Sequence, residues 1–137
     1  TLRVEHQSSV PPTGAPSKIL NSGFYNNGTG SSGFQNSGDY DEGYGNIGSY
    51  QTGFQNTNGF NTGFFNSGQQ NVGVGNSGNT DTGFGNAGVA GNTGFYNAGS
   101  NNPGFGNAAT GNSGAGSPGS QTSGGFNRGT QVAGFFR

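Results

Sequence analysis

The stretch Gly33-Phe34-Gln35-Asn36-Ser37-Gly38 states the pattern that decides the fold. The same order of glycine, aromatic residue and asparagine occurs ten residues earlier, at 23–28, and recurs with variation from Gly43 onward. The pitch stays at ten residues except for one extra residue near Val89-Ala90-Gly91. A fixed internal period of this kind indicates a repeat architecture rather than a layered globular core.

Asparagine occupies two positions of the ten-residue unit. One follows the leading glycine by three residues, and the other, less regular, precedes that glycine by two. The unit is therefore a pair of pentapeptides, of which only the first regularly carries an aromatic residue. The first position holds Asn26, Asn36, Asn46, Asn56, Asn66, Asn76, Asn86, Asn97, Asn107 and Asn127. The second holds Asn21, Asn61, Asn71, Asn92, Asn102 and Asn112, with Asp41 and Asp81 in place of asparagine.

These residue types disfavour helix and favour a coil of short strands. Glycine costs about 1 kcal/mol in a helix interior, and asparagine competes there with the backbone. Both tolerate the left-handed conformation, so we expect a corner every five residues with strands of two or three residues between corners. The sequence therefore predicts an all-β fold, a β-solenoid (β-helix) whose stacked coils contain ten or twenty residues each.

Stacking the coils places like residues above one another. We expect the asparagines to form hydrogen-bonded ladders and the aromatic residues to form a ladder that buries apolar surface along the axis. A ten-residue coil has little interior, however, so an outward direction for some aromatic residues stays open. The aromatic ladder consists of Phe24, Phe34, Tyr44, Phe54, Phe64, Phe84, Phe95 and Phe105, with Val74 as one aliphatic member.

The chain divides into three parts. Residues 1–20 lie outside the repeat and form a linker or cap, residues 21–116 are the repeat array, and residues 117–137 are a degenerate repeat with the C-terminal end. Because the chain begins at Thr1, we expect it to be a piece of a longer protein. A mobile or assembly-dependent chain remains the alternative to an ordered solenoid, because glycine and proline are abundant.

Composition excludes several function classes. Charged residues make up 7% of the chain, against about 25% in an ordinary domain. Four basic residues cannot neutralise many phosphates, so we expect no nucleic-acid partner. The absence of cysteine excludes disulfides and thiolate metal sites. No segment approaches the length of apolar sequence that a transmembrane helix requires.

Three features could carry chemistry, and each has a simpler interpretation. The acidic cluster Asp39-Tyr40-Asp41-Glu42 is not repeated, so we interpret it as a solvated loop rather than a calcium site. His6 is the only histidine and has no evident nucleophile beside it. A partial row of hydroxyls precedes the leading glycines and could bind ice or carbohydrate if it were regular: Ser22, Ser32, Thr52, Thr62, Thr82 and Thr93.

The repeat resembles a known family. Residues 61–68, Asn-Thr-Gly-Phe-Phe-Asn-Ser-Gly, and 81–88, Asp-Thr-Gly-Phe-Gly-Asn-Ala-Gly, are similar to the Asn-x-Gly-x-Gly-Asn-x-Gly repeat of mycobacterial PPE proteins, in their major polymorphic tandem repeat subgroup. The two stretches depart from that repeat at Phe65 and Asp81. The resemblance covers residues 21–116. The helical domain that binds PE proteins in this family is absent here, since Pro11-Pro12-Thr13 is not its Pro-Pro-Glu motif.

The resemblance implies type VII secretion and a location in the outer envelope, at the cell surface or beyond. It brings no catalytic residue, so we expect no enzyme, no cofactor and no metal. We expect a structural or interaction protein that presents a repetitive surface for envelope association or host interaction. Two alternatives remain: a self-assembling fibre subunit, with copies stacked end to end or side by side, and a flat ladder face that binds glycan, lipid or ice.

Overall fold

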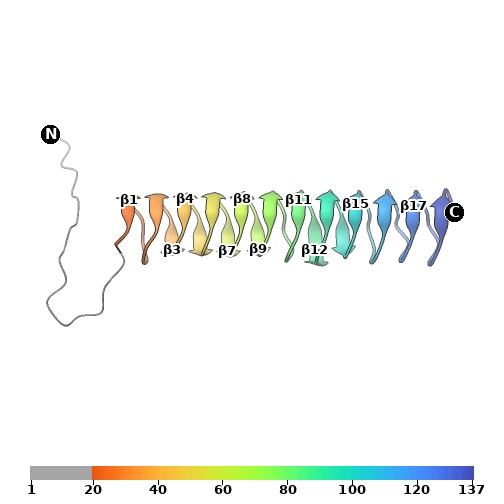
Figure 1. Ribbon diagram of the computed structural model, residues 1–137, viewed down its shortest axis with the longest axis horizontal. Helices are drawn as coiled ribbons and strands as arrows, with labels where there is room; N and C mark the ends of the chain where they lie inside the picture. Colours follow the sequence, from red (N-terminus) through yellow and green to blue (C-terminus); the bar gives the residue numbers. More distant parts are fainter. Residues whose placement is uncertain (1–19) are drawn as a thin grey trace.

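The computed structural model describes residues 20–137, which form a single straight rod (Figure 1). The predicted linker or cap at residues 1–20 lies outside the described residues apart from Leu20, and so does His6. Every regular element in the described range is a short parallel β-strand, so the predicted all-β solenoid is confirmed. Across residues 20–137 no helix is long and apolar enough to cross a membrane.

One long sheet runs the whole length of the rod, and shorter sheets lie opposite it. The long sheet has 12 strands: β1 Ser22–Phe24, β2 Ser32–Phe34, β4 Glu42–Tyr44, β6 Thr52–Phe54, β8 Thr62–Phe64, β10 Val72–Val74, β11 Thr82–Phe84, β13 Thr93–Phe95, β15 Pro103–Phe105, β16 Ser113–Ala115, β17 Ser123–Gly125 and β18 Ala133–Phe135. A four-stranded sheet contains β3 Ser37–Asp39, β5 Ile47–Ser49, β7 Thr57–Gly59 and β9 Ser67–Gln69, and a pair contains β12 Ala87–Ala90 and β14 Ala98–Ser100.

The strand register fixes the size of one coil. Strand β6 pairs with β8 so that Thr52 lies beside Thr62, Gly53 beside Gly63 and Phe54 beside Phe64. The same shift of ten residues relates most neighbouring strands of the long sheet. One coil therefore contains ten residues, and this settles the choice between ten and twenty that the sequence left open.

The extra residue near Val89 is absorbed without breaking the stack. Strand β12 is one residue longer than the others, and its register against β14 shifts between Gly88 and Ala90 as in a β-bulge. On the long sheet, β11 and β13 remain in register with a shift of eleven residues. The insertion is thus confined to one face of the rod, and the repeat continues through β18 in the same arrangement.

Left-handed corner residues recur every five residues, as predicted, but the asparagines of the repeat do not occupy them. The left-handed corner residues follow the aromatic position, and many are bulky, as with Tyr25 and Phe65 at φ 56° and 57°. None of the asparagines at the two repeat positions is in this conformation, and nearly all of their side chains lie inside the coil. Asparagine is therefore selected here for hydrogen bonding rather than for its tolerance of the left-handed region.

The glycine in the middle of each strand is required by the spacing between coils. Gly63 has φ 124°, and a Cβ atom built on it would lie 2.0 Å from the carbonyl oxygen of Gly73 in the next coil. Backbone occupies that position, so a neighbouring side chain cannot move aside to make room. The coils can stack at β-sheet spacing only if this position has no side chain.

We predict that Gly63→Ala destabilises the solenoid by more than about 3 kcal/mol, because it adds both a clash with backbone and strain at positive φ. Thermal unfolding followed by circular dichroism measures the change. Gly75→Ala is the matched control, since its φ is 65° but a Cβ atom there meets nothing within 4 Å. Equal losses for the two variants would contradict the role assigned to the spacing between coils.

Candidate interaction surface

The interior of the rod is filled by amide side chains. Of the described residues, no hydrophobic side chain is buried, whereas Asn56 and Asn61 on opposite sides of the coil are both fully buried. Two columns of such residues run along the axis. The first contains Asn36, Asn46, Asn56, Asn66, Asn76, Asn86, Asn97, Asn107, Ser117 and Asn127, and the second contains Ser31, Asp41, Gln51, Asn61, Asn71, Asp81, Asn92, Asn102, Asn112 and Thr122.

Each amide of the first column links its own coil to the neighbouring ones. The backbone N–H and the side-chain Nδ2 of Asn66 both donate to Oδ1 of Asn56, at 3.0 and 3.1 Å. Nδ2 of Asn56 in turn donates to the carbonyl oxygens of Thr52 at 3.3 Å and Gly63 at 2.8 Å. Every polar atom of the buried amide is thereby paired, as a buried polar group requires. Asn26 begins the same ladder at the more exposed end of the rod.

The second column uses the same design with more variation. The N–H of Asn71 donates to Oδ1 of Asn61 at 2.9 Å, and Nδ2 of Asn61 donates to the carbonyls of Thr57 and Gly68 at 2.8 and 2.9 Å. Elsewhere the acceptor is a hydroxyl or a longer amide, as where Asn61 N–H donates to Oε1 of Gln51 at 3.2 Å. An oxygen acceptor for the next coil's N–H is thus the feature these residues share.

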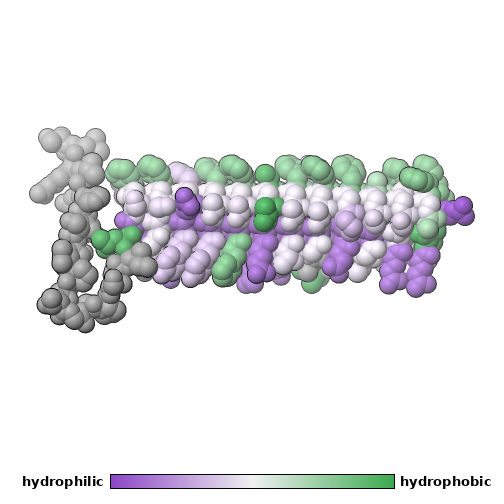
Figure 2. Space-filling view, viewed as in Figure 1, coloured by the Kyte–Doolittle hydropathy of each residue, from purple (hydrophilic) through white to green (hydrophobic). Residues whose placement is uncertain are grey.

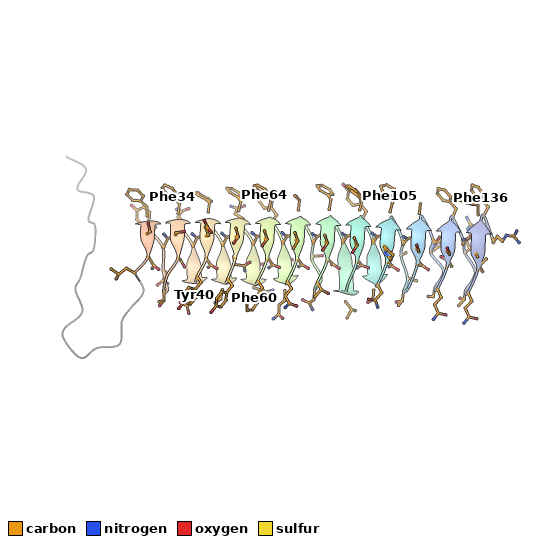
Figure 3. All side chains as sticks on the ribbon, in the orientation of Figure 1. Phe34, Tyr40, Phe60, Phe64, Phe105 and Phe136 are labelled. Atoms are coloured by element: carbon orange, nitrogen blue, oxygen red, sulfur yellow. The ribbon has the colours of Figure 1, made fainter. Side chains whose placement is uncertain are left out.

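The aromatic ladder lies outside the rod, and the expectation that it buries apolar surface along the axis is wrong. The side chain of Phe64 is 52% exposed, and the other ladder members face outward from the same edge. In Figure 3, Phe34, Phe64 and Phe105 project from one long edge. The physical reason is volume: two amides and two glycines per coil already fill the interior, and the backbones are too close to admit a ring.

Rings from the neighbouring corner position widen this row. Phe65 packs edge-on against Phe54, with ring centroids 5.4 Å apart, and Tyr96 packs in the same way on Phe84 at 5.3 Å. Near the C-terminal end, where Ala115 and Gly125 interrupt the ladder, the corner rings take over. We name the combined set the aromatic ridge: Phe24, Tyr25, Phe34, Tyr44, Phe54, Phe64, Phe65, Val74, Phe84, Phe95, Tyr96, Phe105, Phe126, Phe135 and Phe136.

Within the ridge, rings stack along the rod axis. Phe24 and Phe34 lie 5.5 Å apart with an interplanar angle of 16°, and Tyr44 and Phe54 lie 5.0 Å apart at 11°. In these pairs the ring faces lie against one another and the hydrocarbon edges point to solvent, whereas Phe54 and Phe64 are tilted by 32° with centroids 6.4 Å apart. Figure 2 shows the result as a hydrophobic band along one long edge of the rod.

The opposite edge is aromatic only near its N-terminal end. Tyr40, Tyr50 and Phe60 form a short stack there, with centroids 5.1 and 5.0 Å apart. Figure 3 places Tyr40 and Phe60 on the edge away from Phe64. The equivalent corner positions of the following coils are Gln70, Thr80, Gly91, Asn101, Gly111, Gln121 and Gln131. The rod is consequently amphipathic from one edge to the other over most of its length.

The acidic cluster is not a solvated loop throughout, and that expectation is wrong for Asp41. This side chain is 1% exposed and stands in the second amide column. Its Oδ1 accepts the N–H of Gln51 at 3.0 Å, but its Oδ2 has no hydrogen-bond partner. Oδ2 of Asp81 has none either. At Asn61 and Asn71 of the same column, this place belongs to an amide Nδ2 that donates to two carbonyls, so a carboxylate oxygen there lacks the donor that the site needs.

The remaining candidate residues stay apart from one another. Among residues 20–137 no group of three or more His, Cys, Asp or Glu side chains is arranged to hold a metal ion. The hydroxyl row lies on the outer side of the long sheet, largely exposed, and is interrupted by Glu42, Val72 and Pro103. The sequence alone did not show that the aromatic side chains form an exposed ridge. The glycine beside each ring could have indicated it, because a coil with a glycine at that position is too narrow to enclose a ring.

We predict losses of stability of very different size for two substitutions that lie two residues apart. Phe64→Ser should lower the free energy of unfolding by less than about 1 kcal/mol, since the ring is already half exposed. Asn66→Ala should lower it by about 3 kcal/mol or more, because the N–H of Asn76 loses its acceptor inside the rod. Urea unfolding of both variants measures this. A greater loss for Phe64→Ser would contradict the amide core.

Asp41 should make the stability depend on pH. Burial raises the pKa of its carboxyl above the ordinary value; the N–H of Gln51 opposes this shift, and the nearby Asp39 carboxylate adds to it. The folded state therefore holds the proton more tightly than the unfolded state. Stability is full below the unfolded pKa and falls as pH rises through the folded pKa.

We predict that Asp41→Asn is more stable than the natural chain at pH 7, by about 1–3 kcal/mol, because the amide restores a donor. The two proteins should have similar stability near pH 3. Denaturant unfolding across this range measures the difference, with Glu42→Gln on the exposed surface as the control. An unchanged gap between pH 3 and pH 7 would show that Asp41 does not hold a proton in the folded state.

Comparison with known proteins agrees with this geometry. A family model described as pentapeptide repeats, in eight copies, matches residues 50–89. These residues lie within the array and include strands β6 to β11. Searches of curated proteins and of solved structures gave no significant match. The five-residue period, the family match and the stacked parallel coils together identify this chain as one that contains a pentapeptide-repeat region folded as a β-solenoid.

Proposed function

We propose that the chain is the repeat region of a secreted or cell-surface mycobacterial PPE-type protein. In this role it is a stiff, non-enzymatic rod that presents a repetitive surface for envelope association or host interaction. The order Asn-x-Gly-x-Gly-Asn-x-Gly, approximated at residues 61–68 and 81–88, supports the family context. A PE-type partner would bind the family's helical domain and not the repeats.

The observation that carries this proposal is the outward direction of the aromatic side chains. Folding in this rod uses buried amides, so the apolar side chains are left on the surface, and most of them lie along one edge (Figure 2). An exposed apolar strip that gathers side chains of successive coils is the kind of surface patch that is often functional in a soluble protein. An interaction rod explains the ridge better than a spacer with no surface role.

Among the ligand classes, an apolar partner suits the ridge better than a glycan. Sugar rings pack on the faces of aromatic side chains, and in the pairs Phe24–Phe34 and Tyr44–Phe54 one face of each ring is already taken by its neighbour. The hydroxyl row is broken at three positions, which weakens its match to a regular lattice such as ice.

The location can be tested on intact cells. We predict that an antibody against the array labels unpermeabilised mycobacteria that produce the full-length protein, and that external chymotrypsin removes the label. A strain without type VII secretion is the control and should retain the protein inside. Trypsin is unsuitable for this test, because the array contains no Lys or Arg between Lys18 and Arg128. Retention in the cytosol of both strains would contradict the proposed function.

A further inference from the structure

We propose that the aromatic ridge docks the rod lengthwise onto a lipid surface, with the ring edges inserted among the acyl chains near the headgroups. This proposal deepens the proposed function, on which it rests, by naming the partner of the ridge. It is carried by the shape of the ridge, by its chemistry and by its asymmetry around the rod.

The ridge is straight, so its whole length can lie against a flat surface. Its rungs belong to successive strands of one straight sheet, from Phe24 in β1 to Phe135 in β18 (Figures 1 and 3). At about 4.8 Å per strand it extends over roughly 50 Å. Because the rod does not coil noticeably in this view, all rungs can touch a flat surface at the same time.

The chemistry of the ridge suits the boundary between headgroups and acyl chains. Its members are phenylalanines with a few tyrosines, and no ridge position carries a charge. Rings stacked along the axis present hydrocarbon edges outward, and tyrosines such as Tyr25 and Tyr96 add a polar tip. Aromatic rings of this amphipathic kind gather at membrane interfaces. The scarcity of basic residues means that attraction to anionic headgroups is not the basis of binding.

The apolar side chains are unevenly distributed around the rod, and this gives the rod a preferred orientation on a lipid surface. On the opposite edge, the corner positions from Gln70 to Gln131 are polar or glycine. The short stack of Tyr40, Tyr50 and Phe60 precedes them, and Val89 in β12 is an exposed apolar residue among them. Figure 2 shows the hydrophobic band along one edge, and mainly hydrophilic residues with a few hydrophobic patches along the other. A rod with one apolar edge lies in an interface as an amphipathic helix does, with the apolar side down.

The width of the ridge argues against a second copy as the occupant. A strip one or two side chains wide and roughly 50 Å long offers roughly 400 Å² per copy, about half of what each partner contributes to a standard protein interface. A lipid surface requires neither a minimum interface area nor a matching shape, since the acyl chains adapt to the ring edges. The ridge is therefore better matched to lipid than to another rod.

Tryptophan substitutions test the orientation. The chain has no tryptophan, so Phe64→Trp on the ridge and Phe60→Trp on the opposite edge each supply a single reporter at similar starting exposure, 52% and 57%. With the 137-residue chain and uncharged phosphatidylcholine vesicles, we expect a blue shift and quenching by brominated acyl chains for Phe64→Trp alone. Equal responses, or no response from either reporter, would overturn the proposal.

Flotation with the same vesicles tests the energetics. Phe64→Ser/Phe84→Ser/Phe105→Ser should lower the vesicle partition coefficient at least about tenfold, which corresponds to about 1.4 kcal/mol. The matched control Tyr40→Ser/Tyr50→Ser/Phe60→Ser should change it less than about twofold. Circular dichroism verifies that both variants stay folded. Because no charge is involved, 0.5 M salt should leave binding unchanged; loss of binding at that salt concentration would overturn the proposal.

Sedimentation distinguishes a lipid surface from a second copy of the chain as the partner of the ridge. If the natural chain dimerises, the ridge variant is monomeric and neither binds vesicles, the occupant is a second copy and the lipid proposal is wrong. Failure of vesicle binding leaves the cell-surface labelling result intact, because that experiment reports location alone. Conversely, cytosolic retention would contradict the proposed function even if the isolated rod binds vesicles.

Discussion

The hydrogen bonds of buried asparagine set the dimensions of this rod. At each rung, the oxygen of one amide accepts the next coil's backbone N–H, and in the first column also its side-chain NH₂, as Asn56 does for Asn66. The NH₂ group reaches carbonyls on its own coil and the next. An apolar side chain would leave that backbone N–H unpaired in a region without water. The short amide therefore fits a ten-residue coil that could not close around a hydrophobic core.

This constraint reverses the usual distribution of side chains. Amides are inside, and rings such as Phe64 are outside, so hydrophobic burial contributes less to folding than it does in a layered domain. Stability accumulates rung by rung through nearest-neighbour contacts, as in other solenoids. The insertion near Val89 illustrates this, because both amide columns continue across it by shifting to a spacing of eleven residues. A local irregularity therefore costs only local hydrogen bonds.

The period alone was sufficient to predict much of the fold. Spacing by ten aligned Gly53 with Gly63 and Phe54 with Phe64, and both alignments occur in the strand register. The direction of the rings was not predictable from a rule that places apolar residues inside, because the available volume decides it. Volume depends on the distance between backbones, which the closeness of Gly63 to Gly73 reveals only in three dimensions. Asp41 was misjudged for a related reason: its acidic neighbours suggested solvent, whereas its place in the repeat put it in the core.

The strand register that aligns the buried amides also aligns the side chains on the surface. Because each amide must lie directly above its neighbour, each ring also lies above a ring, and the apolar residues form an edge rather than scattered contacts. Where the ladder position loses its ring at Gly125, Phe126 places one at the next position without disturbing the buried amide of Asn127. Since the rings contribute little to holding the coils together, their composition can vary with the surface they contact. A core of short polar side chains thus leaves the outer positions free to define what the rod binds.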